Sequence, residues 1–264
     1  MGKNLQVNEN PAPPHQLLNV GDQFSLPLYE GEELDFIPQK GSLDIVYEDD
    51  HLLILNKPAG LLVHPDTKSG RGTLCNWVAD YYKRTGQSHR IRYIHRLDKE
   101  TSGGIIFAKH FLAHSLLDDR LAKKEIHRLY LALAKGAFSN MSGTLQGAIA
   151  RDRHYSGRFR VAKDGIPALT HYQILALDKE CSLVELALKT GRTHQIRVHL
   201  SHLGHPLLGD TMYGGPKVGG LLRHALHSWK IGLAHPLSGE ALEFEIEIPD
   251  DMSQFIKRKK FTKP

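Results

Sequence analysis

The stretch that decides the fold is a short polar turn, His95-Arg96-Leu97-Asp98-Lys99-Glu100-Thr101-Ser102-Gly103. It lies between two apolar runs, 91–94 and 104–108, so the carboxylate of Asp98 is held between two predicted strands. An aspartate in a turn commonly bonds only its own backbone, in an Asx-turn. Taken alone, these nine residues favour that structural role.

Two further stretches change this interpretation. One comes earlier in the chain, Leu55-Asn56-Lys57-Pro58-Ala59-Gly60-Leu61-Leu62-Val63-His64-Pro65. The other comes later, Lys189-Thr190-Gly191-Arg192-Thr193-His194-Gln195-Ile196-Arg197-Val198-His199. In this order, the three stretches closely resemble the RluA family of RNA pseudouridine synthases. The resemblance covers roughly residues 41–250.

The resemblance implies a fold, a reaction and a partner. It implies an α+β pseudouridine synthase fold, with a mixed, largely antiparallel central sheet, flanking helices and a basic active-site cleft. The expected reaction is the isomerisation of specific uridines in ribosomal or transfer RNA, with Asp98 as the nucleophile. The target uridine is not implied, and neither is the choice between direct attack on C1′ and a glycal route.

Composition agrees with such a partner without requiring it. The chain has 264 residues, a formal net charge of +5 and 41% hydrophobic residues, which is typical of a soluble globular protein. Excess positive charge favours a polyanionic partner. Two distant cysteines indicate a reducing compartment, and no apolar leader or membrane-length run is visible. We therefore expect a cytoplasmic monomer that needs RNA but no obligate protein partner.

The hydrophobic pattern predicts more strands than helices. Helices are expected over 73–85, 110–121 and 194–203, and strands over 45–47, 52–55, 105–108, 129–134, 170–174 and 183–188. Strands and helices do not alternate regularly, which independently favours α+β over a doubly wound sheet. We divide the chain into an N-terminal arm (1–40), a catalytic domain (41–250) and a basic tail (251–264). The arm is a loose segment or a remnant of an S4-like RNA-binding domain.

The chemistry of pseudouridylation explains why one carboxylate suffices. The bond from ribose C1′ to uracil N1 breaks, and the same base is rejoined through C5, without any redox step. No cofactor or metal is therefore expected. A glycosidase needs a second carboxylic acid to protonate its leaving oxygen, whereas uracil leaves as a delocalised anion. Asp98 meets this requirement as an oxygen nucleophile.

Two further catalytic residues follow from the resemblance. Arg197 is expected to pair with Asp98, because an adjacent guanidinium favours the carboxylate over the acid. Its alternative is an exposed helix arginine in a weak ion pair. Tyr130 is expected to stack on the target base and to take part in removal of the C5 proton. Its alternative is a core tyrosine with a bonded hydroxyl, and Tyr93 is the competing candidate.

Arginines supply the predicted RNA contacts. Residues 151–163 hold five Arg or Lys with interleaved aromatics, and the spacing predicts a β-ribbon with one basic face. A solvated charge run is the alternative. Arg96 is placed to fill the space of an extruded base or to hold a flanking phosphate, unless it only bonds turn carbonyls. The predicted RNA-binding residues are Arg96, Arg151, Arg153, Arg158, Arg160 and Arg192.

Three other functions share features with parts of this sequence. His194, His199, His202 and His205 crowd one segment near Asp210, but the His-Glu-x-x-His pattern of a metallohydrolase is absent. A protein kinase is excluded, because no Asp-Phe-Gly or glycine-rich phosphate loop accompanies the His-Arg-Leu-Asp sequence. A non-catalytic RNA-binding protein on the same scaffold stays open, although binding alone would not need the predicted catalytic residues.

Overall fold

The computed structural model describes residues 5–13, 15–29, 32–65 and 70–262. Its strands are β1 (Gln6–Val7), β2 (Asn10–Pro11), β3 (Phe24–Ser25), β4 (Asp44–Glu48), β5 (Leu52–Lys57), β6 (Arg92–Tyr93), β7 (Ser102–Ala108), β8 (His127–Lys135), β9 (Ser142–Gln146), β10 (Ile149–Arg151), β11 (Phe159–Val161), β12 (Leu169–Leu177), β13 (Cys181–Leu188), β14 (Leu226–Ala234) and β15 (Ala241–Glu245). Its helices are α1 (Leu74–Arg84), α2 (Phe111–Ala122), α3 (Gln195–His202), α4 (Asp250–Arg258) and the 3-10 turn η1 (Thr211–Tyr213).

A ten-stranded sheet forms the centre of the described chain. Eight strands follow the order β4-β5-β7-β14-β8-β13-β12-β9, with β6 beside β7 and β15 beside β14. Only β7 and β14 run parallel; the other pairs in this sheet are antiparallel. The predicted α+β fold with a mixed, largely antiparallel sheet is confirmed.

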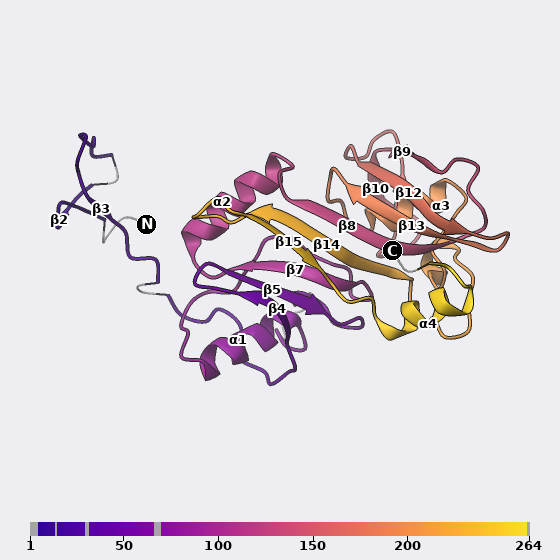
Figure 1. Cartoon of the computed structure of the whole chain (residues 1–264), viewed down its shortest axis with the longest axis horizontal. Coiled ribbons are helices and arrows are strands. Elements are labelled where there is room, and N and C mark those ends of the chain that lie inside the picture. The colour runs from indigo at the N-terminus through magenta and orange to yellow at the C-terminus, as the bar shows by residue number, and fades with distance from the viewer. Residues whose placement is uncertain (1–4, 14, 30–31, 66–69, 263–264) are drawn as a thin grey trace.

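Both faces of the sheet are covered, and the sequence of β5 shows why. Its residues 52–55 are an unbroken apolar run, and all four are fully buried. Leu53 and Leu55 pack in one core cluster, whereas Leu52 and Ile54 pack in another on the opposite face. A strand that is buried on both faces has no solvent-facing side, so its sequence does not alternate between apolar and polar residues. Figure 1 shows α1 and α2 beside β4, β5 and β7, with α3 and α4 at the other end of the sheet.

Close approach of β7 and β14 depends on a glycine. The parallel pairing is short, with Ser228 opposite Gly103. Gly103 has a φ of 110°, and a Cβ there would lie 2.3 Å from the backbone oxygen of Ser228. Only glycine tolerates both the conformation and the contact. The last residue of the nine-residue stretch therefore lets these two strands meet directly beside the turn that holds Asp98.

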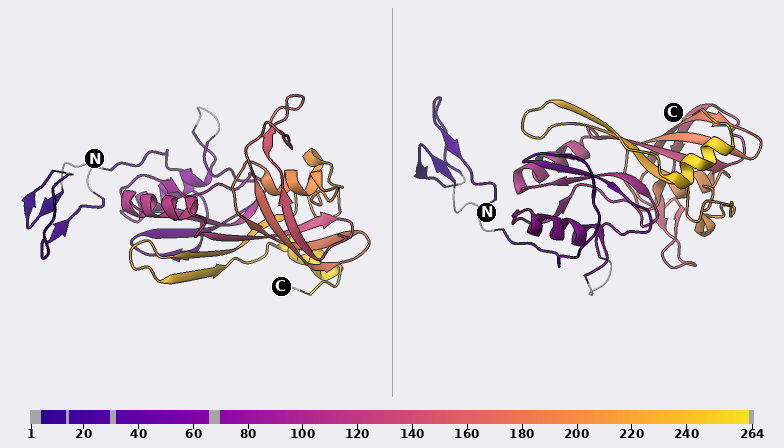
Figure 2. Two further views of the ribbon diagram at one scale, coloured as in Figure 1. Left: turned by 90° about the horizontal axis from the view of Figure 1, so that it is seen from above. Right: turned by 60° about the horizontal axis from the view of Figure 1, so that its bottom comes forward.

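The N-terminal segment divides at a different point than the sequence predicted. Strands β1, β2 and β3 form a small separate sheet, which stands apart from the body in both views of Figure 2. Residues 32–40 instead join the body. Asn76 of α1 donates to the carbonyl of Ile37 over 2.9 Å, and Leu34 and Phe36 pack against the core. The boundary thus lies nearer residue 32 than residue 40.

The C-terminal segment is a packed helix over most of its described length, which corrects the prediction of a basic tail. Met252, Phe255 and Ile256 of α4 are buried in a core cluster, at the spacing of one helix face. Lys257 and Arg258 occupy the last turn, where cations favourably oppose the helix dipole. The basic residues that suggested a solvated tail therefore belong to the polar end of an amphipathic helix.

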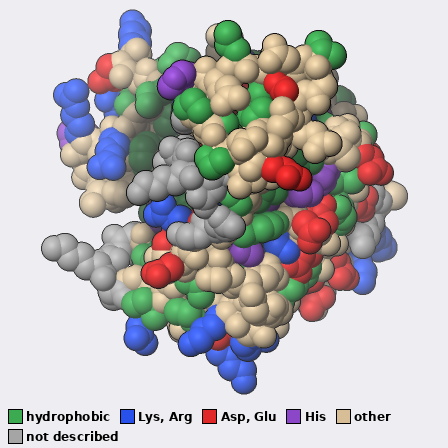
Figure 3. Space-filling model, turned by 90° about the vertical axis from the view of Figure 1, so that its left-hand side faces the viewer, with side chains coloured by type: hydrophobic (Ala, Val, Ile, Leu, Met, Phe, Trp, Pro, Cys, Tyr) green, Lys and Arg blue, Asp and Glu red, His purple; other side chains and the backbone are tan. Residues whose placement is uncertain are grey.

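Figure 3 shows the face at the N-terminal side, where Asp and Glu side chains gather mainly on the right of the view and Lys and Arg side chains lie mostly at its left and lower edges. Within the described part of the chain, no helix has the length and apolar character needed to cross a membrane.

Candidate active site

Asp98 lies in the turn that leads from β6 into β7. The backbone amide of Thr101 donates to the carbonyl oxygen of Asp98 over 3.1 Å, so the backbone closes the turn. The Asp98 carboxylate accepts a hydrogen bond from Arg197 at 3.2 Å, and the side chain is 24% exposed. The Asx-turn alternative is therefore wrong, because this carboxylate bonds to a distant helix.

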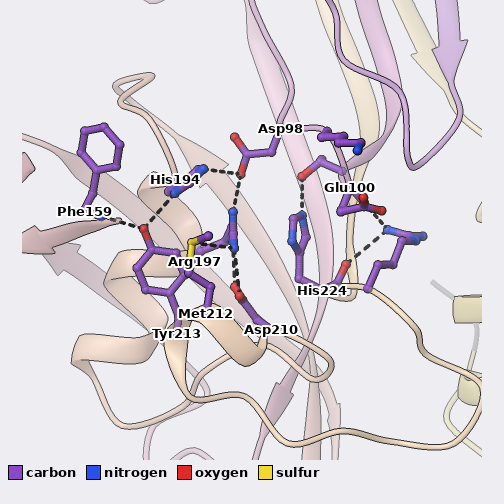
Figure 4. A network of polar contacts seen from close by, with 12 residues as sticks. Asp98, Glu100, Phe159, His194, Arg197, Asp210, Met212, Tyr213 and His224 are labelled. Carbon is purple, nitrogen blue, oxygen red and sulfur yellow. Dashed lines mark hydrogen bonds and ion pairs between the residues drawn. The ribbon is translucent and has the colours of Figure 1, made fainter. Parts of the chain in front are cut away.

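Arg197 of α3 connects Asp98 to a second carboxylate. Its Nη1 contacts Asp98, while Nε and Nη2 donate to the two oxygens of Asp210 over 2.7 and 2.9 Å. The side chains of Arg197 and Asp210 are only 7% and 2% exposed. Figure 4 shows the guanidinium held between the two acids. The bidentate contact with Asp210 fixes the plane of the guanidinium and directs its remaining nitrogen, Nη1, at Asp98.

Charge at Arg197 is maintained in spite of burial. Desolvation disfavours the guanidinium cation, but the Asp210 and Asp98 carboxylates together outweigh it and hold the pKa of Arg197 above its ordinary value. A surface ion pair would be exposed and weak. This pair is buried, so the alternative of a surface helix arginine is wrong.

A pocket that is open to solvent lies beside Asp98. Its walls include all three predicted catalytic residues, Asp98, Tyr130 and Arg197. They also include two of the predicted RNA-binding residues, Arg96 and Arg192. The pocket therefore brings residues of the second and third motifs together with Tyr130 of β8.

Tyr130 reaches the pocket from β8. It is 4% exposed and belongs to the main core cluster, yet it also lines the pocket. Burial raises the pKa of Tyr130 above its usual value, so the side chain is a neutral phenol. The ring therefore packs in the core and also forms part of the pocket wall, while its stacking on a target base stays a prediction. Tyr93 instead stacks on His64, with ring centroids 5.4 Å apart, and does not line the pocket.

Comparison with known proteins assigns this site to a family. The family described as RNA pseudouridylate synthase matches residues 51–202, more than half of the chain. The chain belongs to that family. It is accordingly an enzyme, an RNA pseudouridine synthase, and the resemblance to RluA proteins is confirmed.

Similar proteins agree along nearly the whole chain. The uncharacterized RNA pseudouridine synthase YhcT of Bacillus subtilis is 44% identical over 256 residues, which cover 96% of this chain and 84% of that protein. Ribosomal large subunit pseudouridine synthase D of Neisseria meningitidis serogroup A is 40% identical over 259 residues, covering 93% and 69%. The solved structure of human RNA pseudouridylate synthase domain containing 4 has a TM-score of 0.70 at 24% identity, covering 84% and 94%, and supports the fold alone.

A buried lysine supports the turn that holds Asp98. Lys57 has no exposed surface, and its ammonium donates to the carbonyls of Pro58, Leu61 and Lys99 over 2.8, 2.7 and 3.0 Å. Burial, with a further contribution from Arg223, lowers the pKa of Lys57 to about 7. One side chain thereby joins the first motif to the residue that follows Asp98.

Arg223 supports the same turn from the other side. Its Nη1 donates to the carbonyl of Glu100 over 2.9 Å, and its Nη2 lies 3.3 Å from Ser102 Oγ. Asp251 accepts from Arg223 at 2.8 and 3.0 Å. Because Asp251 is in the first turn of α4, this helix is linked through Arg223 to the turn that holds Asp98.

Two of the predicted RNA-binding arginines lie at the pocket mouth. Arg96 is exposed, and its Nη1 is 3.1 Å from His64 Nε2. Arg192 is also exposed, and its Nε donates to the carbonyl of Pro167 over 3.3 Å. Both keep guanidinium nitrogens accessible beside the pocket, which suits contact with phosphates next to an extruded nucleotide.

The predicted β-ribbon forms, but its single basic face is wrong. Strands β10 and β11 pair with Arg151 opposite Phe159 and Ala150 opposite Arg160. Cross-strand partners share a face of a ribbon, so Arg151 and Arg160 lie on opposite faces. Spacing by two sets the face within one strand, whereas the register between strands depends on a turn that the sequence pattern did not define.

Arg158 and Arg153 differ in how far they are accessible. Arg158 is partly buried, with its guanidinium 5.2 Å from the ring centroid of Tyr155 and 5.5 Å from that of Tyr213. Arg153 is exposed, and its Nη2 lies 3.5 Å from Asp164. Arg158 therefore packs against the body, while Arg151, Arg153 and Arg160 are exposed.

The histidines that suggested a metal site have separate partners. His199 contacts Thr170 through Nδ1 at 3.0 Å and the carbonyl of Gly147 through Nε2 at 3.1 Å. His205 Nδ1 lies 2.8 Å from the carbonyl of Lys135. Among the described residues, no three His, Cys, Asp or Glu side chains are arranged to hold a metal ion.

Asp210 is a site residue that sequence reasoning misses, because its sequence neighbours connect it only with the histidine cluster. It is the only acidic residue between Arg197 and Glu240. A buried arginine needs a carboxylate partner, so this isolated acid was a usable signal. The contact of Tyr213 with His194 had no comparable signal, because it depends on how η1 folds back over α3.

Proposed function

We propose that the enzyme isomerises uridines that are extruded from structured ribosomal or transfer RNA, with Asp98 as the nucleophile. The observation that carries the proposal is the Asp98 carboxylate at the wall of an open pocket, paired with the buried guanidinium of Arg197. Similarity to ribosomal large subunit pseudouridine synthase D favours ribosomal RNA as the first substrate to test.

Asp98 and Arg197 divide the first step between them. As the bond from C1′ to N1 breaks, its electron pair leaves with uracil, and Asp98 either bonds to C1′ or removes a ribose proton to form a glycal. Arg197 keeps the carboxylate oriented, because Asp210 already fixes the guanidinium plane. The enzyme therefore begins the reaction with its nucleophile in place and does not reorganise it.

Tyr130 contacts the detached base. A neutral phenol in the pocket wall supplies a ring on which uracil can stack while it turns. After the base turns, C5 bonds to C1′, and Asp98 either leaves C1′ with its electron pair or, on the glycal route, returns the ribose proton. In the last step the C5 proton leaves, either to the Tyr130 oxygen after that phenol loses its own proton or to solvent. The base is held throughout between the ring and the turn of Asp98.

Exposed arginines hold the RNA around the extruded uridine. Arg96 and Arg192 contact phosphates at the pocket mouth, and Arg96 is also placed to occupy the vacated space in the stack. Arg151, Arg153 and Arg160 contact the backbone farther away, from both faces of the ribbon.

Replacement of Asp98 by asparagine tests the proposal. The rate of pseudouridine formation in a ribosomal RNA fragment is expected to fall about a thousandfold or more, since removal of a covalent nucleophile has effects of this size. RNA affinity is expected to remain. Asp118→Asn, the same change at an exposed position of α2, serves as the matched control. Wild-type turnover in Asp98→Asn would reject the assigned nucleophile.

A further inference from the structure

A chain of hydrogen bonds links the basic ribbon to the pocket. The backbone amide of Phe159 in β11 donates to Tyr213 Oη over 2.9 Å, and Tyr213 Oη lies 2.8 Å from His194 Nδ1. The amide of Phe159 can only donate, so the Tyr213 hydroxyl proton finds a partner among these groups only if it is donated to His194 Nδ1. Tyr213 Oη then accepts from the amide and donates to Nδ1. The proton of a neutral His194 then lies on Nε2.

This Nε2–H faces the site of the reaction. His194 lines the pocket, and Nε2 is 3.9 Å from Asp98 Oδ2, too far for a hydrogen bond. Figure 4 shows the imidazole between Tyr213 and Asp98. The ring is held in this position, since Phe159 and Tyr213 both pack edge-on against it, and Arg197 covers the Tyr213 ring at 4.8 Å.

The backbone at His194 is also unusual. It precedes α3 with φ 55° and ψ 21°, a left-handed conformation that glycine adopts most readily. A β-carbon at this position is therefore tolerated only with some strain, and the side chain that it carries lies in the pocket. The strain and the placement coincide at one residue, as they often do at functional sites.

The surroundings favour a neutral imidazole. Burial lowers the pKa of His194, the Asp98 and Asp210 carboxylates oppose this effect, and the Arg197 cation reinforces it. His194 is consequently an uncharged donor next to the nucleophile. An imidazolium would bind the Asp98 carboxylate and compete with its attack, whereas a neutral N–H leaves the carboxylate free.

We propose that His194 is a further catalytic residue, whose Nε2–H donates a hydrogen bond to the uracil O2 as the bond from C1′ to N1 breaks. The electron pair of that bond passes to uracil, whose charge spreads onto O2 next to N1. The histidine proton is shared in the hydrogen bond and is not transferred. Tyr213 is a positioning residue, because its hydroxyl keeps the proton on Nε2. The inference rests on the proposed role of Asp98.

Chemical rescue tests the donor directly. In His194→Gly the left-handed backbone is retained, and a space the size of an imidazole is opened beside Asp98. The kcat for pseudouridine formation is expected to fall about a hundredfold to a thousandfold, as for loss of one preorganised donor, with KM for RNA unchanged. Added imidazole should restore part of the rate. Added 1-methylimidazole, which fills the space but has no N–H, should not.

Two further measurements separate the possible failures. An RNA with 5-fluorouridine at the target position has no C5 proton to lose. His194→Gly should therefore slow cleavage of the glycosidic bond in this RNA by the same factor as in the unmodified RNA. Tyr213→Phe should lower kcat by a smaller factor than His194→Gly. A wild-type kcat in His194→Gly, or equal effects of the two imidazoles (including none from either), would overturn the assignment. Activity in Asp98→Asn would instead overturn the proposed function on which it rests.

Discussion

Replacement of Arg197 by lysine tests whether the shape of the guanidinium, and not only its charge, holds the Asp98 carboxylate, the proposed nucleophile. Three nitrogens of Arg197 reach two carboxylates, at 2.7 and 2.9 Å from Asp210 and 3.2 Å from Asp98. A lysine ammonium is one point charge and cannot bond both acids in this geometry. Asp210 is 2% exposed and Asp98 is 24% exposed, so leaving Asp210 unpaired costs more. The ammonium is expected to pair with Asp210, so that Asp98 loses its charged partner.

The magnitude follows from the lost contact. A hydrogen bond to a charged group contributes about 1.5–3 kcal/mol. Since each 1.36 kcal/mol changes a rate tenfold, the kcat of Arg197→Lys is expected to fall about 10- to 150-fold. The free energy of unfolding should fall by less than the roughly 3–5 kcal/mol of a broken buried pair, because Asp210 keeps a partner. RNA affinity should not change, since exposed arginines supply it.

The assay compares turnover, binding and stability in the same variant. Tritium at C5 of uridine is released when pseudouridine forms, so its release under single-turnover conditions measures the rate, while filter binding measures RNA affinity. Arg84→Lys makes the same change in an exposed ion pair with Asp80 of α1 and should behave as wild type. A wild-type rate in Arg197→Lys, or an equal loss of rate and affinity, would refute the reasoning.

Two further predictions concern stability. Gly103→Ala should lower the free energy of unfolding by at least about 1–3 kcal/mol, because its Cβ would clash with the backbone of Ser228. Urea unfolding measures this loss, with Gly219→Ala as the control, since a Cβ at Gly219 meets open space. Equal urea midpoints for the two variants would contradict the prediction. Burial lowers the pKa of His227 from 6.5 to about 4. The unfolded chain therefore takes up this proton first, and stability falls as the pH drops from about 6.5 to about 4, by up to about 1.4 kcal/mol per pH unit. His227→Asn should flatten this pH dependence, and an identical slope in both proteins would exclude it.

The contact between Asp98 and Arg197 could be predicted across 99 positions because both residues stand in motifs that specify one site. The same reasoning failed for the ribbon, where a pattern within one strand says nothing about register with the next. It also failed for α4, since the apolar stripe of Met252, Phe255 and Ile256 is short and sits among charged residues. Periodicity identifies long elements well and short amphipathic ones poorly.

Long-range polar contacts were the least predictable part of the site. The bond from Tyr213 to His194 arises where η1 turns back over α3, and no spacing rule places a tyrosine hydroxyl there. The same holds for Arg223, an ordinary arginine in sequence that becomes buried between two segments. Tertiary packing, and not local preference, decides which polar side chains meet.

The bond from Arg223 to Glu100 joins positions 123 residues apart, and its anchor Asp251 is later still. A ribosome therefore makes Asp98 long before it makes the residues that hold the turn around it. A nascent chain carries this acid on an incompletely held turn until Asp251 of α4 binds Arg223. The geometry around Asp98 is consequently complete only after α4 has been synthesised.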